Sequence, residues 1–241
     1  MIGVRVCRIG LDPGREALDA AWAWLAPDER KRAERYRFAR DRRRYVAARG
    51  ALRELLGREV GLAPERVAFV YGPQGKPALG VESDVRFNLS HSGEVGLLAV
   101  ARGAEVGVDV EEVRADFATD EIAERYFSEA ERVVLRAMSP EARAAAFFAC
   151  WTRKEAILKG VGGGLYIDLD GFDVTVAPDE PVRLVASRDP AVDARLWWLG
   201  SLDVGDGYAA AVALAAGGED VVVEGPLEWP GAPPDRYRDR C

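Results

Sequence analysis

The sequence predicts an α+β protein that consists of two similar α+β subdomains related by pseudo-two-fold symmetry. Residues 95–111 and 208–224 share one layout, in which a strand, a glycine turn, a second strand and a glutamate follow one another. A segment with helical spacing of apolar residues precedes each of them. Two copies of one unit, each too small to bury its hydrophobic face alone, explain this duplication.

The elements give the boundaries of the two copies. Helical spacing extends over residues 20–25 and 45–56 and, in the second half, from Asp120 onward and over 147–159. Runs with strand character cover residues 67–71, 85–89, 95–101 and 105–111. We expect the last two runs to form a hairpin at Gly103, and the second helix to end at Gly57. The predicted subdomains are residues 1–112 and 113–224, followed by a proline-rich, charged tail over 225–241 that we expect to be extended or disordered.

Composition restricts the class of protein. Of the 241 residues, 49% are hydrophobic and 30% are charged, as in soluble globular proteins. The net charge of −7 argues against a protein that coats nucleic acid over its whole surface. There is no basic leader and no run of about 18 apolar residues, so we expect a cytoplasmic protein without a membrane span. Three widely spaced cysteines predict reduced thiols, and a single histidine excludes a metal site built from several histidines.

Two carboxylates stand close together near the end of the first half. Asp109 and Glu111 are two residues apart on a predicted strand, so they point to one face while Val108 and Val110 point to the other. Like charges placed this way repel unless a cation lies between them, and carboxylate oxygens suit Mg²⁺ better than zinc. The alternative is that both acids are exposed polar residues of an edge strand.

The predicted helix over residues 147–159 carries a second charged pair. Glu155 and Lys159 are four residues apart and share a face, although the rest of the helix is mostly apolar and ends in a glycine run at Gly160 and 162–164. The alternative is a surface ion pair that contributes a few tenths of a kcal/mol.

Two further segments are typical of anion binding. Residues 88–92 hold the single histidine, His91, between Ser90 and Ser92 in an expected loop, where clustered donors suit an anion. Residues 30–58 hold 12 arginines and lysines against three acids, which suits a phosphate-rich ligand. The alternatives are a solvated histidine and a solvated helix face.

Taken together, four motifs closely resemble those of the 4'-phosphopantetheinyl transferases. They are Gly75-Lys76-Pro77, the segment 88–92, Gly107-Val108-Asp109-Val110-Glu111, and the segment 151–159. Their order and separations also fit. The resemblance is to the larger class typified by the surfactin synthetase activator, a pseudo-symmetric monomer of two α+β subdomains, and it covers the chain up to about Glu224. It therefore implies the 4'-phosphopantetheinyl transferase fold.

The resemblance implies a reaction, its cofactor and its partners. The enzyme would transfer the 4'-phosphopantetheine arm of coenzyme A to a serine of an apo acyl or peptidyl carrier protein, releasing 3',5'-ADP, which is holo-acyl-carrier-protein synthase activity. Such carriers serve fatty acid, polyketide and nonribosomal peptide biosynthesis. No nucleic acid or membrane partner is implied.

By motif position, the resemblance also assigns roles to residues. Asp109, Glu111 and Glu155 would hold Mg²⁺ against the diphosphate. Glu155 would also accept the proton of the carrier serine, directly or through a water, and Lys159 would contact the phosphates at the transferring end. The nucleotide phosphates would be bound by Arg32, Arg44, Lys76, Ser90 and His91.

Two other functions would use the same features. A Mg²⁺-dependent phosphohydrolase would also combine converging acids with basic phosphate contacts, but it would cleave coenzyme A or nucleotides without a carrier protein. A nucleic-acid-binding module would explain residues 30–58, but the acidic remainder of the chain and the lack of interleaved exposed aromatic residues in that run count against it.

The segment 122–135 is the expected docking surface for the carrier. It supplies more apolar side chains than one helix face needs to bury, and Arg125 and Arg132 stand beside them. The alternative is that these apolar residues pack into the core of the second subdomain.

Overall fold

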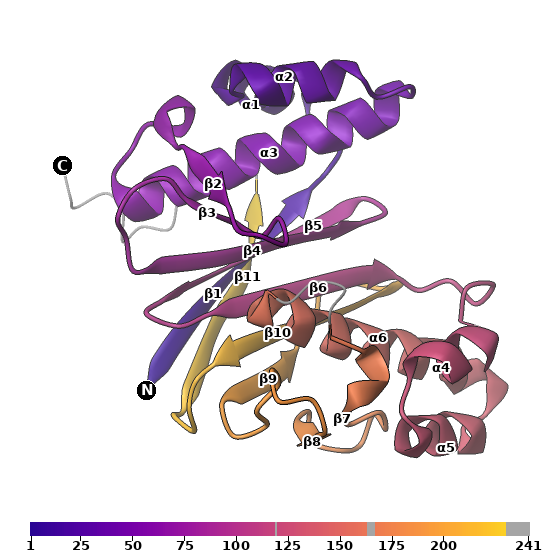
Figure 1. The fold of residues 1–241 in the computed structure, drawn as a ribbon. Coiled ribbons are helices and arrows are strands. Elements are labelled where there is room, and N and C mark those ends of the chain that lie inside the picture. Colours follow the sequence, from indigo (N-terminus) through magenta and orange to yellow (C-terminus); the bar gives the residue numbers. More distant parts are fainter. Residues whose placement is uncertain (119, 163–166, 230–241) are drawn as a thin grey trace.

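The computed structural model describes residues 1–118, 120–162 and 167–229. Figure 1 shows strands in the middle of the molecule, the helices of the first half on one side of them and those of the second half on the other. Separate apolar cores lie between α1, α3 and the first sheet, between the two sheets, and between α6 and the second sheet. This arrangement confirms the predicted α+β class.

From α1 in the first half and from α4 in the second, the elements follow in the same order, whereas β1 precedes α1 only in the first half. The first half consists of β1 (Ile2–Gly10), α1 (Arg15–Trp24), α2 (Pro27–Glu34), α3 (Ala39–Val60), a 3₁₀ turn (Pro64–Arg66), β2 (Phe69–Tyr71), β3 (Pro77–Leu79), β4 (Val85–Ser92), β5 (Val95–Arg102) and β6 (Val106–Glu112). The second half consists of α4 (Asp120–Tyr126), α5 (Glu129–Ala137), α6 (Pro140–Val161), a 3₁₀ turn (Leu169–Gly171), β7 (Phe172–Val174), β8 (Leu184–Ser187), β9 (Trp197–Ser201), β10 (Tyr208–Ala215) and β11 (Val221–Trp229).

The sequence predicted that helix α3 ends at Gly57, and this prediction is wrong. It continues to Val60 and ends at Gly61, whose φ of 68° is the left-handed conformation that glycine adopts without strain. Gly57 is buried, and a Cβ on it would lie 2.5 Å from the carbonyl oxygen of Leu62. Its glycine therefore serves close packing and not helix termination.

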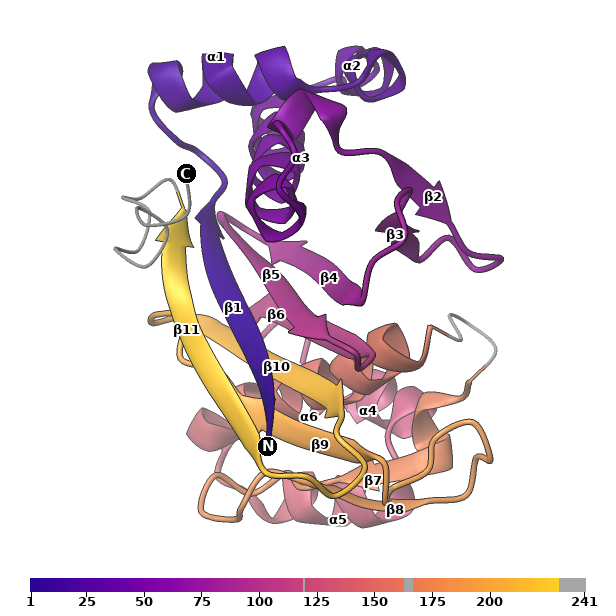
Figure 2. The same ribbon diagram turned by 90° about the vertical axis from the view of Figure 1, so that its left-hand side faces the viewer.

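The strands form two main sheets. The first has the order β11-β1-β5-β4 and the second the order β6-β10-β9. Strand β11 pairs with β1 in parallel, and the other pairs in these sheets are antiparallel. Each half thus contributes its last strand to the sheet of the other half, and Figure 2 shows β11 lying along β1. The division at residue 112 stays a prediction, but hydrogen bonding crosses it in both directions.

The expected hairpin of the strands around Gly103 is wrong. Strands β5 and β6 belong to different sheets, and the turn at Gly103, with φ of 68°, takes the chain from one sheet to the other. The physical reason lies in β6, whose two faces have different partners. Val108 and Val110 face the core between the sheets, and Gly107 faces helix α6.

Residues 88–92 are not a loop. Strand β4 pairs with β5 without interruption from Val85 opposite Arg102 to Ser92 opposite Val95, and the chain turns only at Gly93 and Glu94. Because side chains on a strand alternate between its faces, Ser90 and Ser92 point to one side of the sheet and His91 to the other.

The expected tail also needs a correction. Residues 225–229 are extended, but they belong to β11, where Leu227 and Trp229 are paired with Cys7 and Ile9 of β1. Trp229 is buried in the first core, which explains why the chain does not leave the fold at Gly225. Residues 230–241 lie outside the described residues.

Two further expectations concern composition and docking. Cys7 and Cys150 are buried free thiols, whereas Cys241 lies outside the described residues. No helix in the described ranges is both long and apolar enough to cross a bilayer. For the expected docking segment, the structure favours the alternative, because Phe127 and Leu135 are buried in the second half's core. Tyr126 and Val134 pack against that core, and Val133 is exposed.

Candidate active site

Helix α6 lies directly on strand β6 because both carry glycine at the contact. A Cβ on Gly107 would overlap with the carbonyl oxygen of Ala156 and the amide nitrogen of Gly160. A Cβ on Gly160 would lie 3.3 Å from the amide nitrogen of Gly107. This close approach brings the last turns of α6, with Glu155 and Lys159, over the acidic face of β6.

Asp109 is the centre of this contact. Its side chain is 1% exposed, and its Oδ1 atom accepts hydrogen bonds from Lys159 Nζ at 2.5 Å and from Ser90 Oγ at 2.8 Å. Lys159 Nζ also donates to Ser90 Oγ at 2.9 Å. Three residues from β4, β6 and α6 therefore meet at one point, and the alternative of an exposed acid on an edge strand is excluded for Asp109.

The second oxygen of Asp109 lacks a partner. Within the part of the chain that the structure describes, Oδ2 is buried and accepts no hydrogen bond. A buried carboxylate oxygen without a donor is unfavourable, and such exceptions call for a reason such as an ion or a ligand group.

Two more carboxylates flank Asp109. Glu111 is half-buried and accepts a hydrogen bond from Ser92 Oγ at 2.8 Å. Glu155 is half-buried on α6. The structure thus brings together all four residues that the sequence analysis assigned to the metal and the transferring phosphate, and it adds Ser90 to them.

Burial and mutual repulsion govern the protonation of the three acids. Burial raises the pKa of Asp109, and the attraction of Lys159 offsets this rise only in part. Burial, and then the charge of Asp109, raise the pKa of Glu111. The pKa of Glu155 is raised by burial, by Asp109 and, more weakly, by Glu111. Each acid therefore holds a proton more tightly than its free counterpart does.

A metal ion fits the donor chemistry of these residues. Carboxylate oxygens are the ligands that Mg²⁺ takes in proteins, and the orphan oxygen of Asp109 lies among them. In the described residues, no group of three His, Cys, Asp or Glu side chains is already arranged so that it could hold a metal. The Mg²⁺ site consequently stays a prediction, and Lys159 is the cation that Asp109 contacts in this structure.

The other face of β4 borders a cavity of about 670 Å³. Its walls include His91 from β4, Arg32 from α2, Arg44 and Tyr45 from α3, and Tyr71 from β2. Ser90 and His91 were predicted to bind the nucleotide phosphates together. The alternation of side chains along β4 separates them, because Ser90 contacts Asp109 and His91 faces the cavity.

Charges in this cavity are incompletely paired. Arg44 donates to Glu94 at 3.3 Å, but its buried Nε has no hydrogen-bond partner among the described residues. The His91 ring is open to solvent, yet it lies in a concave wall, and this partial burial lowers its pKa. The charges of Lys159 and Arg44 lower that pKa further, so His91 is neutral at pH 7.

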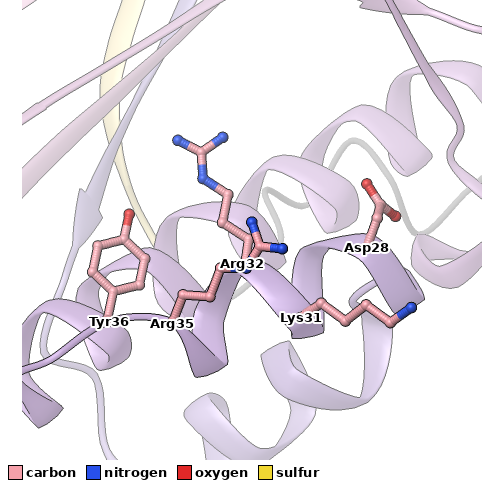
Figure 3. A pocket seen from close by; sticks show the side chains of 5 residues that line it. All are labelled: Asp28, Lys31, Arg32, Arg35 and Tyr36. Carbon is pink, nitrogen blue, oxygen red and sulfur yellow. The ribbon is translucent and has the colours of Figure 1, made fainter.

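A shallower pocket of about 620 Å³ adjoins the cavity and shares part of its lining. It is formed by Asp28, Lys31, Arg32, Arg35 and Tyr36. Figure 3 shows that these side chains come from α2 and the residues just after it, and that the guanidinium of Arg32 and the hydroxyl of Tyr36 point to the same side. The predicted basic segment therefore supplies Arg32 and Arg44 to one continuous hollow surface.

Lys76 lies elsewhere. Its ammonium group donates to Glu105 Oε2 at 2.7 Å and to the backbone oxygen of Gly160 at 2.8 Å, at the C-terminus of α6. The structure does not bring it together with His91, Arg32 and Arg44.

Sequence reasoning missed several residues that build the site. Asn88 is buried, and its Oδ1 accepts the amide hydrogen of Val108 at 3.0 Å, which aligns β4 with β6. Lys154 is fully buried, forms an ion pair with Glu131 at 2.8 Å and anchors α6. An asparagine within a predicted strand and a lysine within an apolar helix are the sequence signals from which these roles could have been predicted.

Comparisons with known proteins agree with this geometry. Residues 105–213 match the 4'-phosphopantetheinyl transferase superfamily, and residues 11–103 match the 4'-phosphopantetheinyl transferase N-terminal family. The chain is 38% identical over 218 residues to the 4'-phosphopantetheinyl transferase HetI of a Nostoc species, which covers 89% of each chain. A 4'-phosphopantetheinyl transferase of Bacillus subtilis is 30% identical, covering 72% of this chain and 75% of its own. The transferase Sfp of Bacillus subtilis is 28% identical, covering 80% and 83%.

Proposed function

This chain belongs to the 4'-phosphopantetheinyl transferase superfamily, and from that premise we propose that it transfers the phosphopantetheine arm of coenzyme A to a serine of an apo carrier protein. In this reaction the serine oxygen bonds to the phosphorus next to the pantetheine. The bond from that phosphorus to the bridging oxygen breaks, and 3',5'-ADP leaves. The carrier is an acyl or peptidyl carrier protein, and the enzyme acts as a cytoplasmic monomer.

The observation that carries the proposal is the position of β4. One face of this strand supports Asp109 and Lys159 through Ser90, and the other face presents His91 to a cavity whose lining includes Arg32 and Arg44. A nucleotide bound in the cavity beside β4 would place its diphosphate close to the acids of β6 and α6, which lie on the other side of that strand. The volume of about 670 Å³ is within the range typical of ligand pockets.

Within the proposal, the cavity binds the nucleotide end of coenzyme A. Arg32 and Arg44 contact phosphate oxygens with their guanidinium groups, which suit phosphate geometry. His91, whose pKa is lowered in the protein without ligand, forms a hydrogen bond with the nucleotide end. Contacts of this kind are equally strong before and during the reaction, so they govern KM more than kcat.

The acids and Lys159 act at the transferring phosphate. Asp109, Glu111 and Glu155 would hold Mg²⁺, which, when bound, neutralises charge on the diphosphate. Lys159 donates to a phosphate oxygen at the transferring end, after exchanging its present contact with Asp109. Glu155 accepts the serine proton, and its raised pKa makes it a better base than an exposed glutamate. A carboxylate bound to a cation is a poor base, so this role requires one oxygen, or an adjacent water, free of the cation.

The experiment is incubation of candidate apo carriers with coenzyme A and Mg²⁺, followed by mass spectrometry of the carrier. The expected result is a gain of one phosphopantetheine on the serine, with one 3',5'-ADP released per carrier. A carrier whose serine is replaced by alanine is the control, and chelation of divalent cations should stop the reaction. Cleavage of coenzyme A at the same rate with and without carrier would identify a phosphohydrolase instead.

A further inference from the structure

Lys76 connects the two halves of the molecule. It lies in the turn between β2 and β3, and its side chain is 22% exposed. The ammonium group donates to Glu105 Oε2 at 2.7 Å, to Gly160 O at 2.8 Å and, more weakly, to Val106 O at 3.5 Å. Three acceptors from the β5–β6 connection, β6 and α6 thus surround one cation from the hairpin.

The backbone oxygen of Gly160, which accepts from Lys76, has no partner within helix α6. Gly160 lies in the last turn of α6, where backbone oxygens have no partner within the helix and the helix dipole favours a positive charge. The stem of Lys76 also packs beside the helix end, since a Cβ on Gly162 would lie 3.2 Å from Lys76 Cδ. Both the charge and the stem of Lys76 are therefore used at this contact.

The hairpin of β2 and β3 has few other supports. The two strands form a sheet of their own, and Figure 2 shows the hairpin standing out from the main sheets. Its base is held by Phe69, which contacts Phe87, and by the bond from Gly80 N to Ala68 O. At the outer end, Val70 and Tyr71 are more than half exposed.

The outer end of the hairpin is also a wall of the cavity. Tyr71 and Pro77 are paired across the hairpin and both line the cavity of about 670 Å³. The turn between them is closed by hydrogen bonds from Gly72 N to Lys76 O and from Gly75 N to Gly72 O. A movement of Lys76 would therefore move the cavity wall with it.

We infer that Lys76 is a positioning residue, which ties the β2–β3 hairpin to the end of α6 and so fixes Tyr71 and Pro77 as one wall of the cavity. This role replaces the expectation that Lys76 contacts a nucleotide phosphate. Helix α6 is held along its length by β6, so loss of the contact releases the hairpin and not the helix. The inference rests on the proposed function for the identity of the ligand, but not for the contact itself.

The first measurement is amide hydrogen exchange in the free protein, which requires no activity. Lys76→Met keeps the stem and removes the ammonium, and Glu105→Ala removes one acceptor. In both variants, exchange at Gly72, Gly75 and the β2–β3 pairs is expected to become roughly 10-fold faster, while exchange in β10 is unchanged. Unchanged exchange in Lys76→Met would overturn the inference, whatever the protein binds.

The second measurement is equilibrium binding of coenzyme A and of dephospho-coenzyme A. Both Kd values are expected to rise by roughly 3- to 10-fold, and to the same extent, in Lys76→Met and Glu105→Ala. KM for coenzyme A should rise with them, whereas kcat stays within about twofold. Lys76→Arg keeps a donor and should restore most of the affinity. If Lys76→Met weakens binding and Glu105→Ala does not, Lys76 is a phosphate ligand and the inference is wrong.

Two control variants complete the test. Glu82→Gln changes an exposed acid near the hairpin that no described contact links to Lys76, and Arg86→Met removes the other cation on Glu105, at 3.1 Å. Both should exchange and bind like the wild type. If Arg86→Met reproduces Glu105→Ala, Glu105 acts through Arg86 and its part in holding Lys76 is excluded. Failure to bind coenzyme A in all variants and in the wild type would instead reject the proposed function, and leave the exchange result standing.

Discussion

The two long helices, α3 and α6, are counterparts that differ at their C-terminal ends. Each has 22 residues and ends at a left-handed glycine, Gly61 or Gly162. Adding 101 to a residue number of α3 gives its counterpart in α6, so that Ala39 corresponds to Pro140 and Val60 to Val161. Their shared length and ending support the duplication that the sequence predicts.

Both helices are held by the same buried arrangement. An acid at the third position of the preceding helix, Glu29 or Glu131, caps the start of that helix and pairs with a cation in the long helix. That cation is Arg53 in α3 and its counterpart Lys154 in α6. Each also donates to two backbone oxygens after the helix, those of Pro64 and Val67 or those of Leu169 and Phe172.

The difference appears at the next positions. The counterparts of Glu155 and Lys159 are Glu54 and Arg58, which pair with each other. Glu54 also accepts a hydrogen bond from Trp229 Nε1 at 2.7 Å. In the alignment of the repeat, Asp109 of β6 corresponds to Val222 of β11, so β11 lacks a counterpart of the central acid.

The comparison separates folding from function. In the first half every charge at the helix end that is named above has a partner, and Trp229 covers it. At the end of α6, Glu155 has a raised pKa, and the neighbouring Asp109 of β6 has a raised pKa and an oxygen without a hydrogen-bond partner among the described residues. The named charges at the end of α3 are paired with one another, whereas the site at the end of α6 keeps acids with raised pKa values and a carboxylate oxygen without a partner in the described part of the chain, which indicates that this site is kept for a ligand.

The largest expected effect tests this contrast directly. Asp109→Asn and Glu155→Gln should each lower kcat by about 100-fold or more, because each removes a charge that acts at the transferring phosphate. The matched change in the first half, Glu54→Gln, should leave kcat and KM unchanged. Initial rates of carrier modification at saturating coenzyme A and Mg²⁺ provide the measurement. Wild-type rates in Asp109→Asn would remove this acid from the site.

The second prediction concerns the shared arrangement. Lys154→Met and Arg53→Met should each lower the free energy of unfolding by about 3 to 5 kcal/mol, since each leaves a buried glutamate without its cation. Arg49 also pairs with Glu29, so the loss should be smaller for Arg53→Met. Urea titration of both variants gives the values. Equal losses would mean that Arg49 contributes nothing to holding Glu29.

How far the sequence could predict this contrast depends on the range of the interactions involved. Composition and spacing are local, and they predicted the two long helices, although not the end of α3, as well as the strand with Asp109. The sheet that a strand joins depends on distant partners, so the pairing of β11 with β1 and the separation of β5 from β6 were not foreseen. Ser90 and His91 were placed in a loop because serine and histidine are polar. Pairing with β5 makes this segment a strand, on which Ser90 points towards the acids and His91 towards the cavity. The sequence of the segment alone does not reveal that pairing.

Long-range contacts also explain what the sequence analysis did not foresee at the site. That Lys76 binds phosphate stays a prediction of the sequence analysis, but its contact with a backbone oxygen of Gly160 could not be foreseen, because nothing in the local sequence marks a backbone oxygen 84 residues away. Phe127 and Leu135 lie in the segment 122–135, which was expected to form the docking surface for the carrier. Their burial depends on the packing of α5 against α6, which the count of apolar residues in one segment does not reveal.

The third prediction is a pH dependence of opposite sign for the acids beside α6 and for Glu29 beside α3. The raised pKa values of Asp109, Glu111 and Glu155 mean that the folded protein binds more protons than the unfolded chain, so stability falls as pH rises through that range. Burial alone would raise the pKa of Glu29, but hydrogen bonds from Arg53 and Arg49 keep it below its ordinary value. Its contribution is therefore present above the unfolded pKa and is lost as pH falls through the folded pKa.

Urea titrations in a chelating buffer measure both signs. The free energy of unfolding should increase as pH falls through the raised pKa values of the three acids, and decrease at more acidic pH, where Glu29 gains a proton. Asp109→Asn should flatten the increase, and Glu29→Gln should flatten the decrease at low pH. An unchanged profile in Asp109→Asn would show that burial does not raise the pKa of Asp109 in the folded protein.

The smallest expected effect concerns the glycines that end the two helices. Gly61→Ala and Gly162→Ala both force a side chain into the left-handed region, at a cost of about 1 kcal/mol in the free energy of unfolding. A Cβ on Gly61 meets open space, whereas a Cβ on Gly162 lies 3.2 Å from the stem of Lys76. We therefore expect Gly61→Ala to leave the kinetics unchanged, and Gly162→Ala to raise KM for coenzyme A by about twofold through the hairpin. Thermal unfolding of the two variants measures the loss of stability, and steady-state kinetics measures KM for coenzyme A. Equal KM values would show that the end of α6 tolerates a methyl group without moving Lys76, because the flexible stem gives way.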